Sequence, residues 1–182
     1  MKNAKQPDRG VFYALADHAG ILRRLCIVAV DFAVLLGLGA LLFVAGDRWE
    51  WIPQCPVELW LLAVYLYMAV LKMTPWGTVG YLLTGVRLVD LRGRRPSLWR
   101  VTLRLIFLVL GPINMLFDII WLGGDPNRQS IRDKFAGTYV IRKRAVPAGE
   151  GRVKYVTYFF LCHCLTFEEI ERADIGPPLS QG

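Results

Sequence analysis

Ionisable side chains inside apolar segments are the residues of this sequence best placed to do chemistry. Four stand within or at the edge of apolar blocks: Arg24, Asp31, Arg104 and Asp118. A charge at the bilayer centre costs about 2.5–3.5 kcal/mol on insertion scales, so such groups face the protein interior and usually have partners. An isolated carboxylate in a low dielectric can exchange a proton for a cation, whereas a neighbouring arginine opposes this exchange. The same Asp–Arg pairs can instead hold helices together.

Long apolar blocks must position these charges. The chain has 182 residues, 54% of them apolar, and nearly continuous apolar runs occupy residues 25–46, 57–71 and 101–122. A membrane-spanning helix needs about 20 apolar residues, so the runs exclude an ordinary soluble domain. The pattern predicts an all-α membrane protein with two transmembrane helices, at residues 21–45 and 57–73, and a third hydrophobic segment.

The third segment contains Gly111-Pro112 at its midpoint, where a helix breaks or kinks. One topology is a re-entrant hairpin, which is tolerated at membrane depth when it is buried in protein. The other is a kinked crossing with a return through residues 155–165, a stretch that is short for a span. The hairpin is favoured because it would place Arg104 and Asp118 near the depth of Asp31, as one buried polar cluster.

The positive charges indicate how the chain is oriented. The net charge is +7, with five Lys and Arg in residues 1–24, one in 47–58, six in 72–100 and nine after residue 122. Because cytoplasmic loops collect Lys and Arg, the N-terminus, the central loop and the C-terminus are expected on the cytoplasmic side. This distribution argues against nucleic-acid binding.

Local composition divides the chain into three parts and adds a small β element. The parts are a polar cytoplasmic arm (1–20), a membrane domain (21–142), and a basic linker (143–154) followed by a short aromatic segment and a polar tail (to 182). Alternation near residues 86–92 and a β-like stretch at 137–142 predict two strands of a small cytoplasmic hairpin or sheet.

Motifs for catalysis, cofactors and metals are lacking in the sequence. There is no Ser/His/Asp set, phosphate-binding loop or zinc signature. The triplet Cys162-His163-Cys164 lacks the second ligand pair that tetrahedral zinc normally requires. We therefore expect no catalytic residue, no metal, no cofactor and no enzymatic activity.

Several of these residues are similar to those of the RDD family of small bacterial integral membrane proteins. That family is named for an arginine at the start of its first helix and for two aspartates. The arginine and the first aspartate resemble Arg24 and Asp31, and an arginine in the following helix resembles Arg104. The closing motif is similar to residues 128–138, which places the second aspartate at Asp133.

The resemblance covers residues 21–142 and includes the glycine-rich stretch 78–90. Arg132 departs from it, because the family often has His there, and Asp118 is not one of the defining residues. The resemblance implies a bacterial cytoplasmic-membrane location and a suspected activity in transport, such as cation/proton exchange, with Asp31 as the intramembrane carboxylate.

Two functions remain under consideration. A non-catalytic integral membrane subunit, or an assembly or stabilising factor of a larger complex, is favoured. The reasons are the small size, the missing internal repeat of many secondary transporters, and a tail after residue 144 without a counterpart in the family. The alternative is a small ion or solute transporter. The expected partners are the lipid bilayer and either another membrane protein or further copies of the chain.

Overall fold

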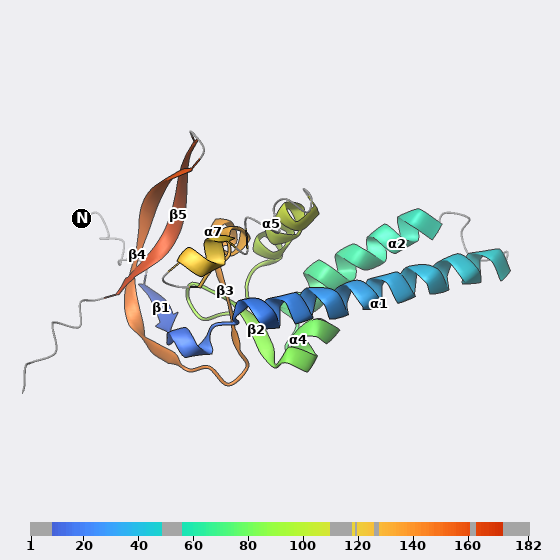
Figure 1. Cartoon of the computed structure of the whole chain (residues 1–182), viewed down its shortest axis with the longest axis horizontal. Helices are drawn as coiled ribbons and strands as arrows, with labels where there is room; N and C mark the ends of the chain where they lie inside the picture. Colours follow the sequence, from blue (N-terminus) through green and yellow to red (C-terminus); the bar gives the residue numbers. More distant parts are fainter. Residues whose placement is uncertain are drawn as a thin grey trace, which may run out of the picture.

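Two antiparallel helices extend to one side of the molecule, and a three-stranded sheet lies at the opposite end (Figure 1). The computed structural model describes residues 9–48, 56–109, 118, 120–125, 128–160 and 163–172. The helices are α1 (Ile21–Arg48), α2 (Pro56–Tyr65), α3 (Leu71–Met73), α4 (Val79–Thr84), α5 (Leu98–Val109) and α7 (Ile131–Ala136). The strands are β1 (Arg9–Tyr13), β2 (Val86–Asp90), β3 (Thr138–Arg142), β4 (Pro147–Phe160) and β5 (His163–Arg172).

Helix α1 is the described helix that is long and apolar enough to cross a membrane by itself. Its buried residues, Arg24, Ile27, Asp31 and Leu35, are spaced three or four apart and therefore share one face. Large apolar side chains elsewhere on the helix, such as Phe43, are exposed. An apolar exposed surface around a narrow buried stripe is the pattern of a helix in contact with lipid.

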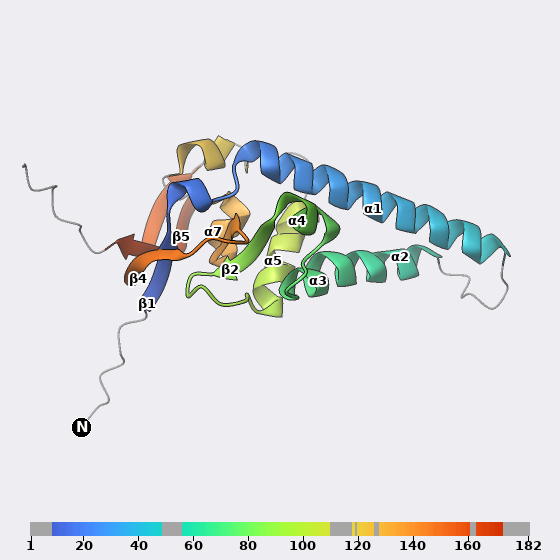
Figure 2. The same cartoon turned by 90° about the horizontal axis from the view of Figure 1, so that it is seen from below.

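The second predicted helix is also present. Helix α2, a π-helical stretch at Leu66–Val70 and α3 follow one another without a break, which agrees with the expected boundaries of 57–73. Figure 2 shows this composite helix beneath α1, with α4 and α5 near their common end. A single π-helical stretch inside an α-helix often marks a functional position, and here it contains Tyr67, which reaches Asp31.

The third hydrophobic segment is described only at its two ends. Its first part is α5, and residues 120–124 are helical. The Gly111-Pro112 break lies outside the described residues. The re-entrant hairpin and the kinked crossing therefore both stay predictions.

The small sheet expected from the sequence is confirmed. Strands β2 and β3 pair antiparallel, with Leu88 opposite Val140 and Asp90 opposite Thr138. They are separated in the chain by α5 and α7, so they form a two-stranded sheet and not a hairpin. This sheet fastens the segment after α4 to the segment after α7.

The chain is mostly helical but not all-α, and the expected linker over residues 143–154 is wrong for most of its length. From Pro147 on, it is part of β4, which pairs with β1 on one side and β5 on the other. The glycines that suggested a linker allow close approach: a Cβ on Gly149 would lie 2.6 Å from the Phe12 ring, and one on Gly151 would lie 2.5 Å from Ile170.

The remaining boundaries also change. The polar arm expected at residues 1–20 is structured from Arg9, since β1 belongs to the sheet and both Tyr13 and Ala19 are buried. The aromatic segment is divided between β4 and β5, and the polar tail is described only as far as Arg172, within β5.

Helix α1 packs closely on α2 through Gly39. The indole Nε1 of Trp60 donates a hydrogen bond to the Leu35 carbonyl oxygen at 3.0 Å, and a Cβ on Gly39 would lie 2.7 Å from that nitrogen. Gly37, two residues earlier, has nothing within 4 Å of the corresponding position. Small residues of this kind let membrane helices approach each other.

We predict that Gly39→Ala lowers the stability of the helix pair by about 1–3 kcal/mol, the usual cost of overpacking. Gly37→Ala is the matched control and should leave stability within about 0.5 kcal/mol, as expected for a surface substitution. Thermal unfolding of both purified variants in mild detergent measures the difference. Equal melting temperatures for the two variants would contradict the packing that we describe.

Candidate functional site

A buried cluster of one carboxylate and two guanidinium groups connects α1, α5 and α7. Asp133 is fully buried, and its Oδ2 lies 2.5 Å from Nη1 of Arg24. Its Oδ1 accepts a hydrogen bond from Nη1 of Arg104. We call these three residues the arginine–aspartate cluster. Because each carboxylate oxygen has a charged donor from a different arginine, burial of Asp133 is electrostatically compensated.

Local structure fixes each member of the cluster. Asp133 is the third residue of α7 and forms a reciprocal capping box with Ser130, which precedes the helix. Capping of this kind satisfies backbone N–H groups that a helix start leaves free. Arg24 lies in the first turns of α1 and also donates to the carbonyl oxygens of Ala19 and Arg128, both at 3.1 Å.

Opposing effects act on the Asp133 carboxyl. Burial alone raises the pKa of this group, but the positive charges of Arg104 and Arg24 outweigh burial and hold the pKa well below its usual range. The carboxyl is therefore ionised at neutral pH. A group of this kind is a structural ion and a poor proton carrier.

Asp31 is the centre of a second polar site, and among the described residues no arginine forms an ion pair with it. Its Oδ1 accepts hydrogen bonds from the Tyr67 hydroxyl at 2.9 Å and the Gly80 N–H at 2.8 Å. Its Oδ2 accepts one from the Thr78 hydroxyl at 2.9 Å. Three donors thus stabilise a carboxylate that is 1% exposed.

Close packing of α4 against α1 makes this second site possible. A Cβ on Gly80 would lie 2.7 Å from both Asp31 Oδ1 and the Ile27 carbonyl oxygen, so glycine is the residue that fits there. Thr78 serves twice, because its side chain also accepts from the Tyr81 N–H as the cap of α4. Asp31 therefore ties the start of α4 to the middle of α1.

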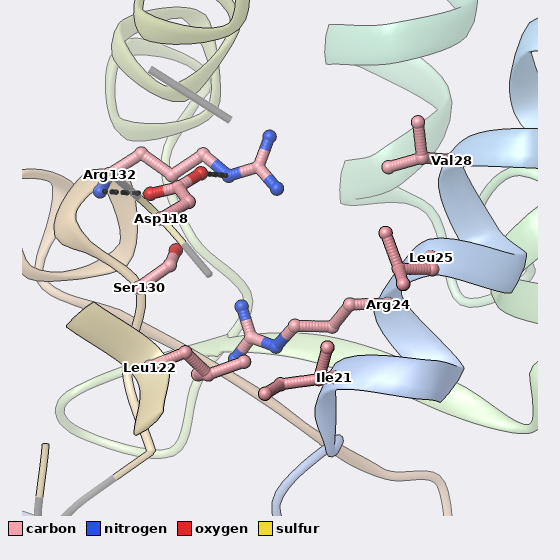
Figure 3. Close-up of a pocket in the computed structure, with 8 residues that line it drawn as sticks. All are labelled: Ile21, Arg24, Leu25, Val28, Asp118, Leu122, Ser130 and Arg132. Carbon is pink, nitrogen blue, oxygen red and sulfur yellow. Dashed lines mark hydrogen bonds and ion pairs between the residues drawn. The ribbon is translucent and has the colours of Figure 1, made fainter. Parts of the chain in front are cut away.

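A third pair, Asp118 with Arg132, lies across a pocket from α1 (Figure 3). The Nε of Arg132 is 2.6 Å from Asp118 Oδ2, and the Arg132 N–H donates to Oδ1 at 3.3 Å. Arg24 crosses the pocket from the other side. The two arginines are thus held apart by separate carboxylates.

Asp31, Arg104 and Asp118, the residues of the expected cluster, do not pair with one another, because each of the three has different partners. Arg104 pairs with Asp133, while Asp31 and Asp118 bond elsewhere. The expectation considered only charges inside apolar blocks. It left out the polar segment containing Asp133, which folds back against α5 and supplies the carboxylate for Arg104.

Asp31 and Arg104 are nevertheless close neighbours. Both line a cavity of about 40 Å³, together with Lys72 and Arg132. A cavity of this size holds a few water molecules, since one water needs about 10–15 Å³ measured in the same way. Sequence reasoning missed Tyr67 and Thr78 as partners of Asp31, although Thr78 belongs to the glycine-rich stretch.

Lys134 forms a further buried site that sequence reasoning missed. Its ammonium lies 2.6 Å from Asp125 Oδ1, contacts Glu169 of β5, and sits 4.6 Å from the centre of the Tyr158 ring. Burial alone lowers the pKa of Lys134, but its bonds to Asp125 and Glu169 outweigh burial and raise it. This lysine joins α7 to the β4–β5 hairpin, and Phe167 packs against Phe135 beside it.

A long apolar helix beside a second one, with charges buried in pairs near their common end, is the arrangement expected of a small integral membrane protein. The family model for the RDD family matches residues 18–137. The chain therefore belongs to the RDD family, a family of membrane proteins. No curated protein and no solved structure matches the chain.

The arginine–aspartate cluster predicts a specific pH dependence. Asp133→Asn leaves Arg24 and Arg104 buried without a counter-charge, which costs about 3–5 kcal/mol for a broken buried pair. Because the folded-state pKa of Asp133 is lowered, its contribution to the stability of the fold is complete above the unfolded pKa of about 3.9. This contribution is lost as the pH falls toward the folded-state pKa. The deficit of the variant should thus be full at pH 7 and smaller below pH 4.

Unfolding in detergent at pH 7, 5 and 3 measures this deficit. Glu150→Gln is the control, because Glu150 forms only an exposed pair with Arg9 at 3.8 Å and should change stability by less than about 1 kcal/mol. A deficit for Asp133→Asn that is no larger than that of the control at pH 7 would exclude the electrostatic role assigned to Asp133.

Proposed function

We propose that this RDD-family protein is a non-catalytic subunit, or an assembly or stabilising factor, of a larger complex in the bacterial cytoplasmic membrane. The hydrogen bonds to Asp31 carry this proposal. Three donors from the protein bond its carboxylate, and Asp133 is paired with two arginines. Carboxylates held by several bonds inside the protein support a rigid framework better than an exchange of ions.

The framework would be oriented by its basic segments, with both termini in the cytoplasm. The sheet of β1, β4 and β5 would then lie on the cytoplasmic side of the helix pair. Its two longest strands lie beyond the part matched by the family. They are attached firmly, since Phe167 and Ile170 of β5 are buried.

Exposed groups on and beside this sheet are suited to hold a partner. Tyr155 of β4 is 71% exposed, and Val146, the residue before β4, is 72% exposed. Exposed aromatic and apolar side chains outside the lipid often mark interaction sites. Within the described residues β5 pairs only with β4, so its outer edge is open to strand addition. We assign partner binding to this sheet and membrane anchoring to the helices.

We predict that tagged full-length protein, purified in mild detergent, retains a stoichiometric membrane-protein partner. Replacing Val146 and Tyr155 together by Ser should reduce the recovered partner at least about tenfold, as expected for loss of interface anchors of about 1–2 kcal/mol each. Mass spectrometry after size exclusion measures recovery. Leu15→Ser, at another exposed apolar position, should leave recovery unchanged. A particle containing only copies of this chain would contradict the proposal.

A specific observation keeps the alternative, a small ion transporter, under test. The cavity of about 40 Å³ beside Asp31 also contains Lys72, and water next to a buried carboxylate is a feature of ion and proton pathways. On this alternative Asp31 would bind the proton or cation.

Asp31→Asn separates the two functions. The amide keeps the shape and can keep both bonds at Oδ1, while the Thr78 hydroxyl can turn to accept from the new N–H₂ group. We therefore expect the variant to fold and to retain its partner. Ion flux into liposomes containing wild-type protein should equal that of empty liposomes. Coupled flux that is lost in Asp31→Asn but kept in Asp47→Asn, an exposed residue near the far end of α1, would favour the transporter.

A further inference from the structure

A groove lined by five basic side chains opens between the loop after α3 and strand β2. Its volume is about 510 Å³. Lys72 comes from α3, Arg87 from β2, Arg94 and Arg95 from the turn after β2, and Lys143 from the turn that follows β3. Among the residues that line the groove, none is acidic. We call it the basic groove.

The basic side chains of the groove lack ion-pair partners. In the part of the chain that the structure describes, none of the five makes an ion pair. Arg87 donates to the carbonyl oxygen of Ala145 at 2.9 Å, which fixes the side chain and leaves its charge. The carboxylate of Asp90 accepts from the backbone N–H groups of Arg92 and Arg94 and is not among the residues that line the groove. An anion is the ligand that this arrangement lacks.

The position of the groove indicates where the anion comes from. Lys72 lies at the end of the second apolar helix, so one wall begins where that helix leaves the lipid. Trp76, also in the wall, is 74% exposed, and Leu83 of the adjacent α4 is 69% exposed. Exposed tryptophan beside exposed leucines is typical of the membrane–water interface. The groove therefore opens at the level of the lipid headgroups.

We propose that the basic groove binds the phosphate group of an anionic phospholipid. Arginine pairs with phosphate through two parallel N–H···O bonds, and Arg94 and Arg95 are the exposed arginines of the turn that can provide them. Basic pockets next to membrane helices bind anionic headgroups by this chemistry. The acyl chains would lie along Trp76 and α4. This site is independent of the partner-binding sheet in the proposed function.

Removal of two groove charges tests the site. The test variant carries Arg94→Gln and Arg95→Gln together. The control variant carries Arg144→Gln and Arg152→Gln together and loses the same charge outside the groove. Each basic residue near a membrane surface adds to the attraction of an anionic headgroup. The affinity of the full-length protein for phosphatidylglycerol should therefore fall at least about tenfold in the first double variant and less than about twofold in the control.

Native mass spectrometry of the detergent-solubilised protein, titrated with phosphatidylglycerol, measures both affinities. Phosphatidylcholine and inorganic phosphate are the comparison probes, and both should bind at least about tenfold more weakly to wild-type protein. Equal losses in the two double variants would overturn the site, because they would show a diffuse charge effect. Phosphatidylcholine bound as tightly as phosphatidylglycerol would overturn the anionic preference, and inorganic phosphate bound equally tightly would replace the lipid by a soluble phosphate ligand.

Discussion

The pairing of one buried carboxylate with two arginines is the interaction on which the rest of the structure depends. An ion as deeply buried as Asp133 is tolerated only with well-placed counter-charges. These come from Arg24 at the start of α1 and Arg104 in α5. Three elements far apart in sequence must therefore meet at one point. Once they meet, α7 is held in place, and β3 follows it directly toward its pairing with β2.

Asp31 extends the same principle with neutral donors. The carboxylate accepts from Tyr67, Thr78 and Gly80, so the composite second helix and α4 are both attached to α1. Because α4 leads into β2 and α7 leads into β3, the two polar sites set the positions of the two strands that then pair. The buried charged groups near the end of the helix pair and the sheet of β2 and β3 are parts of one framework.

Much of this fold follows from residue patterns, and the exceptions have physical causes. Apolar runs located the first two helices, and alternation located β2 and β3, because these signals are local. The partner of Arg104 could not be predicted from the depth of Arg104 in the apolar segment alone. That partner, Asp133, lies in a polar segment, and only the folded chain brings this segment next to the helices. Asp133 entered the candidate site through the family resemblance and not through its own surroundings in the sequence.

The β4–β5 hairpin was missed for a different reason. Gly149 and Gly151 suggest a linker, yet each is required where a neighbouring side chain approaches the strand closely. A readable signal was present in the charges: Lys154 lies opposite Glu169, and Arg152 lies opposite Glu171. Opposite charges in register across two strands favour a hairpin. The buried Lys134 fixes this hairpin to α7 through Glu169. The strands beyond the matched residues 18–137 are therefore held by a residue within that matched part. A tail attached so firmly moves with the helices, so that the partner proposed to bind it would keep a fixed position relative to them.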